Sequence, residues 1–439
     1  MALSAASVFE VRTAGADTNG GGFVTGASGT DFSQQNSKNT TGSNISTTDA
    51  VGAGTTTLTS ITGNFSTAIV GNIIYLQGGT GSLAAGWYQV TARASTTSIT
   101  LDRAVAVGTG ITMNIGGALL SPAIASSIAT VGGMIIYLQN GGSVFSITTA
   151  TTNVAGGAIT NSSVVSFVGY ATNRTFSNTD SPPTIQTNVS TATQVTGSGC
   201  VYRNIIFDGN TQTASRHTAS TGANFIICMI MNFNTVSAAT SPAYISCSAT
   251  SNSAAVFQGS CIYCEAYANS ATPFNCTVGY GCLSYGNTVA SVGFTGANTN
   301  QFLNCVAYGN AGAGFGFNGG TVSTLINCHA EANTGFGFLF ANGTKVSINN
   351  SAFNNTAGNV SATAITMTSG FITLTSTAFT NAAGNVFNLN TTAGGGASLR
   401  AAGFPSVFPR GLTSNFRDIG AAQHQDPTGS AGGSFTFVS

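Results

Sequence analysis

Hydrophobic and polar positions recur at a fixed interval between residues 282 and 355. Segments reading CLSYGN, CVAYGN, CHAEAN and SAFNN begin 23 residues apart, and apolar and polar residues alternate within them, as in short strands. Small, β-branched and aromatic residues with Gly-Asn turns fill the repeat, which predicts a parallel β-helix of three short strands per coil rather than a leucine-rich repeat. The repeating columns are Cys282, Cys305, Cys328 and Ser351; Phe294, Phe317 and Phe340; and the pairs 302–303, 325–326 and 348–349.

Stacked coils place residues of one column about 4.8 Å apart. We therefore expect the cysteine column to face the interior and the phenylalanine column to form an aromatic ladder. The column of Asn287, Asn310 and Asn333 is expected at a turn, where asparagine tolerates left-handed backbone. His329 and Glu331 replace a valine and a tyrosine of the neighbouring coil, alternate with the cysteine, and are therefore predicted to face solvent.

Changes of pattern divide the rest of the chain. Residues 1–50 are interpreted as an N-terminal attachment or lead-in segment, and 51–117 as a small antiparallel β-barrel or sandwich, because short alternating strands are separated by Gly and Ser turns. Residues 118–400 are assigned to coils of about 23 residues, entered through a helical turn that starts at Pro122. Residues 401–439 are predicted to cap the open last coil.

The chain is almost free of charge. Only 5% of its 439 residues are charged, with 11 basic against 11 acidic residues, so nothing favours a nucleic-acid or anionic-membrane partner. No run approaches 18 apolar residues, which argues against membrane insertion. The first residues lack the features of a secretory signal, so synthesis and retention in a cytoplasm are expected. All nine cysteines lie between 200 and 328 and are predicted to be buried, reduced thiols.

The acidic residues provide a test for catalysis on polysaccharide. Glycoside hydrolysis needs two carboxylates about 5 to 9.5 Å apart. The repeat places Asp208 and Glu331 in one column but several coils apart, and Glu265 in the column of His329, so no pair is predicted. His329 and Glu331 lie at i and i+2 and could poise a base or bind a metal weakly. Asp208, Glu331 and His329 therefore remain the only, weak, catalytic candidates, and no cofactor or metal site is expected.

Two other patterns are given structural interpretations. His217 and His424 lie in loop-like stretches and are predicted to be surface residues. The CIYC motif, with Cys261 and Cys264, has no second pair at zinc-type spacing, and its two thiols are expected on opposite faces of a strand.

The opening VFEVRTAGADTNGGGFVTG, the closing RDIGAAQHQ and the coils between them resemble right-handed β-helix proteins of tailed bacteriophages, with the pectin-lyase-like fold of tailspikes. The resemblance implies a virion structural protein: a tail spike, a tail fibre or a head-decorating fibre. It also implies localisation in the virion, contacts with other virion subunits and a homo-oligomer, of which a trimer is the expected form. A host-surface glycan is the expected external partner.

Two alternative functions remain open. The chain could be a polysaccharide depolymerase whose site is completed between subunits, or the subunit of a self-assembling extracellular β-solenoid filament.

Overall fold

The chain folds into two compact units, which are described one at a time. The first comprises residues 1–206 with 220–223, and the second 207–219 with 224–439. The computed structural model describes residues 3–148, 151–153, 165–174, 181–190, 193–195, 198–219, 222–238, 242–288, 292–296, 299–317, 323–341, 345–362, 367–400, 402–403 and 418–423.

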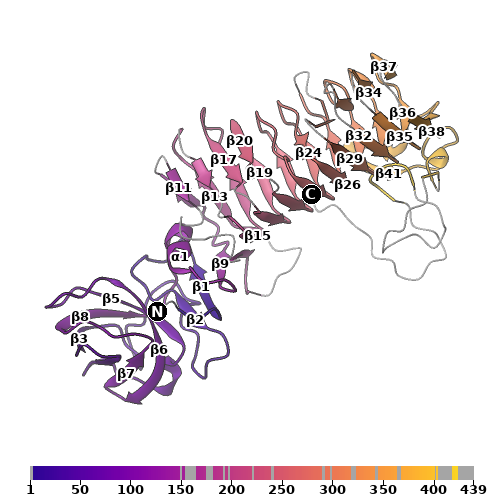
Figure 1. The fold of residues 1–439 in the computed structure, drawn as a ribbon. Helices are drawn as coiled ribbons and strands as arrows, with labels where there is room; N and C mark the ends of the chain where they lie inside the picture. The colour runs from indigo at the N-terminus through magenta and orange to yellow at the C-terminus, as the bar shows by residue number, and fades with distance from the viewer. Residues whose placement is uncertain are drawn as a thin grey trace. The chain divides into compact units, whose positions relative to one another are not determined.

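The first unit contains a closed antiparallel barrel (Figure 1). Hydrogen bonding runs from β3 through β4, β7, β6, β5 and β8 back to β3. Alternating apolar side chains fill its interior, among them Leu58, Ile74 and Ile99. The strands are β3 (Thr47–Gly52), β4 (Thr57–Thr59), β5 (Asn72–Gln77), β6 (Gly86–Ser95), β7 (Ser98–Leu101) and β8 (Gly108–Ile115).

The N-terminal strand connects this barrel to the first coils within the same unit. β1 (Ser7–Val11) pairs antiparallel with β2 (Gly22–Val24), which pairs with β5 of the barrel. β1 also pairs in parallel with β9 (Ile135–Gln139), so it is the first rung of a parallel sheet. The helix α1 (Pro122–Ile128), capped by the Ser121 side chain, precedes β9 as predicted. The remaining parallel pairs of this unit are β9 with β12 (Ser166–Tyr170), β12 with β15 (Val201–Arg203), β10 (Phe145–Ile147) with β13 (Thr184–Thr187), and β11 (Thr151–Asn153) with β14 (Thr193–Val195).

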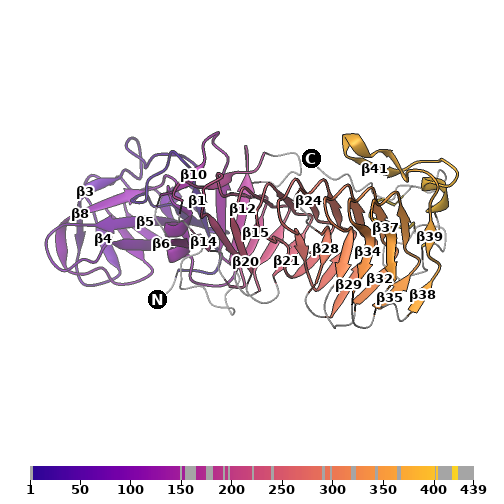
Figure 2. The same ribbon diagram turned by 90° about the horizontal axis from the view of Figure 1, so that it is seen from above.

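The second unit is a parallel β-solenoid, in which successive coils stack strand on strand (Figure 2). The predicted fold class, an all-β chain with a parallel β-helix and a small N-terminal β module, is confirmed. Sheet A contains β18 (Asn224–Ile226), β21 (Ala243–Ile245), β23 (Ser260–Ile262), β26 (Val278–Tyr280), β29 (Asn300–Leu303), β32 (Ser323–Ile326), β35 (Lys345–Ile348) and β38 (Met367–Ser369). Sheet B contains β16 (Ile206–Asp208), whose Asp208 belongs to this unit, then β19 (Met229–Met231), β22 (Ser248–Thr250), β24 (Glu265–Tyr267), β27 (Leu283–Tyr285), β30 (Val306–Tyr308), β33 (His329–Glu331), β36 (Ser351–Phe353) and β39 (Ile372–Thr373). The third face contains β17 (Arg216–Ala219) and β20 (Thr235–Ala238), followed by β25 (Phe274–Asn275), β28 (Phe294–Thr295), β31 (Phe315–Phe317), β34 (Phe336–Phe340) and β37 (Gly358–Ala362).

Parallel stacking ends earlier than the sequence repeat suggested. The segment STAFTNAAGN, which echoes an earlier coil, forms an antiparallel hairpin of β40 (Phe379–Asn381) and β41 (Val386–Leu389). The last parallel pair of sheet B joins β36 and β39. Most of the predicted cap, 401–439, lies outside the described residues.

The corner between sheets A and B explains the cysteine column. In seven successive coils the residue at this corner has left-handed backbone, with φ between 48° and 63°. A cysteine follows six of these seven residues, and its thiol donates to the carbonyl two residues earlier, as Cys282 does to Tyr280 and Cys305 to Leu303. All nine cysteines are buried and free, as predicted. The corner residues are Ile227, Ser246, Tyr263, Gly281, Asn304, Asn327 and Asn349.

The asparagine column is a continuous buried ladder of amides. The Asn310 side-chain amide donates to the Asn333 side chain at 2.9 Å and to the Ser284 carbonyl at 3.1 Å. Its oxygen accepts from the Asn287 side chain at 2.7 Å. The left-handed residue is the one before each ladder member, for example Gly309, so the expected left-handed asparagines were placed one position too late. The ladder joins Asn252, Asn269, Asn287, Asn310, Asn333 and Asn355.

The interior phenylalanines stack, but the predicted register slips. Phe294 pairs with Phe315 rather than Phe317, at 4.8 Å between ring centroids, because that coil is two residues shorter on this face. Phe317 does stack on Phe340. The stack runs through Phe257, Phe274, Phe294, Phe315 and Phe338.

The last predicted coil is also shifted, by one residue. His329 pairs with Ser351, so Asn350, not Ser351, follows Cys328 in its column. Asn350 also accepts the Cys328 backbone N–H, and its side chain donates to the Leu325 carbonyl. For the same reason the predicted pairs 325–326 and 348–349 are offset, and Leu325 faces Ser347.

Asn310→Ala tests the amide ladder. The substitution removes the side-chain oxygen that accepts the Asn287 backbone N–H and side-chain amide, and one of the two donors to the Asn333 oxygen. We therefore expect a loss of about 3 kcal/mol in the free energy of unfolding. The measurement is chemical denaturation followed by circular dichroism. Thr324→Ala, on the outer face of sheet A, is the control and should change stability by less than about 0.5 kcal/mol. Equal stability of both variants would contradict a structural role for the ladder.

Candidate functional site: a serine, a histidine and a glutamate under the C-terminal hairpin

The outer face of sheet B brings His329, Glu331 and Ser351 together. His329 and Glu331 alternate on β33, and the parallel register sets Ser351 of β36 beside His329. His329 Nδ1 lies 2.8 Å from Ser351 Oγ, and His329 Nε2 lies 3.0 Å from a Glu331 oxygen. A serine, a histidine and a carboxylate in hydrogen-bond contact are the residue types of a nucleophile, its base and an orienting acid.

This cluster differs from the active site of a hydrolase because all three side chains are buried. His329 and Ser351 are 0% exposed and Glu331 is 2% exposed. The prediction that His329 and Glu331 are solvated is therefore wrong. The segment at residues 377–379 covers them, and sequence periodicity alone did not reveal this contact between residues about fifty positions apart.

Glu331 binds the covering segment directly. One carboxylate oxygen accepts the Thr377 hydroxyl, and the other accepts the Ala378 backbone N–H at 3.0 Å. Burial alone would raise the pKa of Glu331, but hydrogen bonds from His329, Thr377 and Ala378 outweigh it and hold the pKa below its usual value. We call these residues, together with Ser351, the hairpin latch.

An apolar cluster surrounds the hairpin latch. Phe379 meets the His329 ring edge-on at 5.4 Å, and Phe387 contacts both Tyr285 and Tyr308. Leu283 and Val306, outward positions of sheet B, are 2% and 0% exposed beneath this segment. Apolar residues at outward positions of two successive coils were the sequence signal that this face is covered.

The other acidic candidates are too far apart to act as a pair. Asp208 accepts hydrogen bonds from the Asn210 N–H and the Asn232 side chain. Glu265 accepts the Ser248 hydroxyl, and burial, opposed by that hydrogen bond, raises the pKa of Glu265. Three strand spacings of sheet B, about 14 Å, separate Asp208 from Glu265 and Glu265 from Glu331. Both separations exceed the glycosidase range of about 5 to 9.5 Å.

His217 differs from its prediction. It lies on β17, is 0% exposed, and neither ring nitrogen has a hydrogen-bond partner among the residues that the structure describes. The rings of Phe207, Phe225 and Phe233 surround it, and burial lowers its pKa to about 3. The surface prediction failed because β17 is a strand of the solenoid, and the alternation of side chains along it points His217 into the interior. His424, the other histidine predicted at the surface, lies outside the described residues.

The CIYC motif also needs correction. Cys261 and Cys264 are both 0% exposed and face the interior together, because the left-handed Tyr263 turns the chain between them. Burial raises the pKa of each thiol well above its usual value, which makes both poor nucleophiles. Among the described residues, no group of three or more His, Cys, Asp or Glu side chains is arranged to hold a metal ion.

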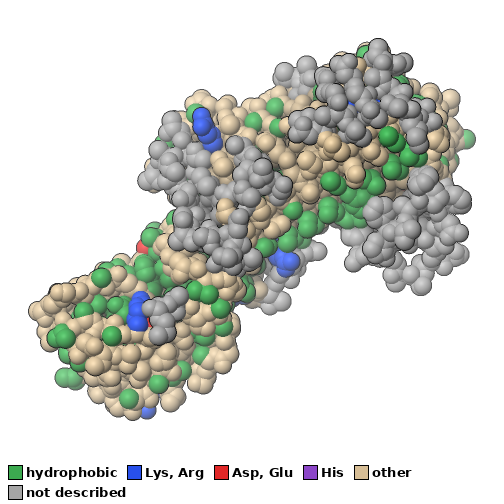
Figure 3. Space-filling view, in the orientation of Figure 1, with side chains coloured by type: hydrophobic (Ala, Val, Ile, Leu, Met, Phe, Trp, Pro, Cys, Tyr) green, Lys and Arg blue, Asp and Glu red, His purple; other side chains and the backbone are tan. Residues whose placement is uncertain are grey.

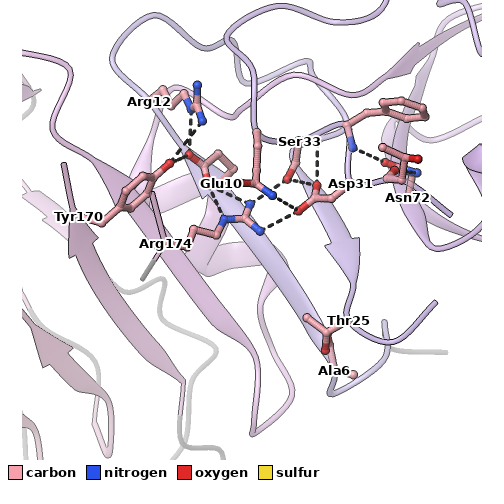
Figure 4. A network of polar contacts seen from close by, with 12 residues as sticks. Ala6, Glu10, Arg12, Thr25, Asp31, Ser33, Asn72, Tyr170 and Arg174 are labelled. Atoms are coloured by element: carbon pink, nitrogen blue, oxygen red, sulfur yellow. Dashed lines mark hydrogen bonds and ion pairs between the residues drawn. The ribbon is translucent and has the colours of Figure 1, made fainter. Parts of the chain in front are cut away.

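A second charged cluster lies in the first unit, at the end of β1 (Figure 4). Buried Glu10 accepts hydrogen bonds from Tyr170 and, at 2.8 Å each, from Arg12 and Arg174. Arg174 also contacts Asp31 at 2.7 Å. This cluster joins the N-terminal strand to the coil that carries Tyr170, and paired charges in an almost uncharged chain were the signal for it.

Comparison with known proteins finds likeness only among solved structures. No family model matches the chain, and no curated protein matches it. The catalytic domain of a GH87 α-1,3-glucanase in complex with tetrasaccharides is 12% identical, with a TM-score of 0.28, and the match covers 74% of this chain and 90% of that one. Pectate lyase Pel9A is 13% identical, with a TM-score of 0.31, and covers 69% and 91%.

The tailspike protein gp49 from Pseudomonas phage LKA1 is 10% identical, with a TM-score of 0.15, and covers 75% of this chain and 67% of that one. With TM-scores this low, these likenesses carry no argument about the site or the activity of this chain. The assignment of the parallel β-helix rests on the strand pairing described above. Among the described residues, no helix is long and apolar enough to cross a membrane.

Lowering the pH should loosen the hairpin latch. Because the folded pKa of Glu331 is depressed, its charge stabilises the fold above its unfolded pKa of about 4.3, and that contribution is lost as pH falls through the folded value. The titratable groups beside it are His329 and Tyr308. We expect a lower protection factor against hydrogen exchange at the Ala378 amide once the pH falls below about 4.3, and already at neutral pH in Glu331→Gln.

Glu265→Gln is the matched control, since Glu265 is also buried on sheet B but does not bond the hairpin. Exchange at Ala378 should be unchanged in that variant. Equal protection of Ala378 at acid and neutral pH would contradict the role of Glu331.

His217→Phe should remove part of the acid sensitivity of folding. The folded pKa of His217 lies below its unfolded value of about 6.5, so the unfolded chain binds the extra proton. Stability should therefore fall by up to about 1.4 kcal/mol per pH unit between about pH 6 and pH 4. The variant should lose this slope in denaturation experiments, whereas Arg216→Gln, exposed on the same strand, should keep it.

Proposed function

We propose that this chain is a non-enzymatic structural protein of a bacteriophage virion, a tail spike, tail fibre or head-decorating fibre, that contacts host-surface glycan through its β-helix faces. The observation that carries the proposal is the state of the carboxylates in the described coils. Asp208, Glu265 and Glu331 are buried, hydrogen-bonded and at least about 14 Å apart. A phage origin is supported by the resemblance of the terminal segments to phage β-helix proteins.

The architecture suits a structural role. Backbone hydrogen bonds, the amide ladder from Asn252 to Asn355 and the phenylalanine stack from Phe257 to Phe338 fix these coils to their neighbours. Little of the described backbone in this stretch is therefore free to move as a catalytic lid. Neutral polar side chains exposed outside sheet A, such as Thr334 and Thr356, can donate to and accept from sugar hydroxyls.

One observation favours polysaccharide depolymerase as a second candidate. Glu265 combines a raised pKa with a position beside Tyr267, which stacks on Tyr285 at 5.2 Å between centroids. A carboxylic acid beside aromatic rings that can stack on a sugar is suited to act as a general acid in the cleavage of a glycosidic bond. A partner carboxylate would have to come from another subunit.

Incubation with capsular polysaccharides from a panel of bacteria tests the proposal. We expect the protein to be retained on one of them without any increase in reducing ends, because no described carboxylate pair spans a glycosidic bond. Reducing-end assays and retention on immobilised polysaccharide measure the two properties. Asp49→Asn is the control, since this carboxylate lies on β3 of the barrel and outside the coils.

Release of reducing ends that is lost in Glu265→Gln or Asp208→Asn, but kept in Asp49→Asn, would establish the depolymerase instead. Detection of the protein in extracellular filaments rather than in purified phage particles would contradict the virion assignment.

A further inference from the structure

Sheet A carries an unbroken apolar column on its outer face. At the last position of each of seven successive strands, an isoleucine, leucine or tyrosine points outward. Ile245 is 36% exposed and the others are half-buried. A band of hydrophobic side chains is visible along β26 and β29 (Figure 3). The parallel register aligns Ile226, Ile245, Ile262, Tyr280, Leu303, Ile326 and Ile348.

From this column we infer that the outer face of sheet A, between β18 and β35, is the interface between copies of this chain. The inference goes beyond the proposed function, since it names the face and the partner and holds for a virion protein or a filament alike. Contiguous exposed apolar surface on a soluble protein marks a site of association.

The spacing of the column selects the partner. Its side chains recur at the strand spacing of about 4.8 Å, and six intervals extend about 29 Å. An α-helix offers a side chain every 5.4 Å along one face, and an extended strand every 6.6 to 6.8 Å, so either would fall out of step within this length. A second copy of the same solenoid has the same spacing from end to end, and its side chains can interdigitate throughout.

Electrostatics permit the same contact. The second outward column of these strands is neutral, so two copies can meet without burying a charge or opposing like charges. The chain as a whole has a formal net charge of zero. This column contains Asn224, Ala243, Ser260, Val278, Gln301, Thr324 and Val346. Association through this face should therefore depend little on salt.

Sheet B provides the internal contrast. There the apolar outward positions Leu283 and Val306 are already covered by the hairpin of the same chain. Its first coils expose Met229 and Met231 at outward positions only partly. These two methionines are therefore matched sites for control substitutions, apolar and outward but on another face.

Sedimentation velocity of the full chain over a range of concentrations tests the inference. We expect the wild type to sediment as an oligomer. In the variant that combines Ile245→Lys with Leu303→Lys, the concentration below which the oligomer dissociates should be at least tenfold higher than in the wild type. Met229→Lys combined with Met231→Lys should leave the oligomer intact. A monomeric wild type, or an oligomer equally stable in the sheet A variant, would overturn the inference.

Cysteine cross-linking keeps the test valid if the lysine variant fails to fold. Tyr280 is the middle residue of the column, so in a parallel or antiparallel pairing centred on it, it faces its own copy. Tyr280→Cys should form an intermolecular disulfide on mild oxidation, since the nine native cysteines are buried, and Met229→Cys should not. Additional cross-linking by Ile245→Cys would identify parallel copies in register. Absence of cross-linking at both sheet A positions would refute the interface.

Discussion

Each side chain of the solenoid must be compatible with the side chain of the same column one strand spacing away. This constraint favours residues that gain from their own repetition: amides that bond to the next amide, rings that stack, and thiols that bond to corner carbonyls. It disfavours charge, because a repeated charge would lie about 5 Å from its copy. The unusual composition of the chain, with 5% charged residues, follows from this single requirement.

Two of the buried carboxylates lie where repetition stops. In one unit, Glu10 is held by Arg12 and Arg174 where the N-terminal strand starts the parallel sheet. In the other, Glu331 receives donors from the hairpin that follows the last parallel pair of sheet B. Both carboxylates bind a segment that has no copy in the next coil. For these two residues, an isolated charge in a stacked fold is a sign of a terminal contact, whereas Glu265 bonds Ser248 of the neighbouring coil.

Local periodicity was sufficient to predict the parallel β-helix, the inward cysteines and the asparagine column, because each depends on contacts between neighbouring coils. It was insufficient for register and for burial. The last coil is one residue shorter than the repeat, which places Asn350 in the cysteine column. Another coil is two residues shorter on the third face, which stacks Phe294 on Phe315. The burial of His329 depends on residues 377–379, a contact that no repeat encodes. The inward position of His217 required strand boundaries that its loop-like sequence did not reveal.

The dependence of each coil on its two neighbours also determines how the fold can come apart. In a one-dimensional array, loss of structure starts most easily at an end, where a coil has a single neighbour, and then spreads by fraying. The C-terminal hairpin lies across the outer face of several coils of sheet B at once, contacting Tyr285, Tyr308 and His329. It thereby couples coils that are not adjacent. The coils at the C-terminal end can unfold one by one only after the hairpin has been released from sheet B.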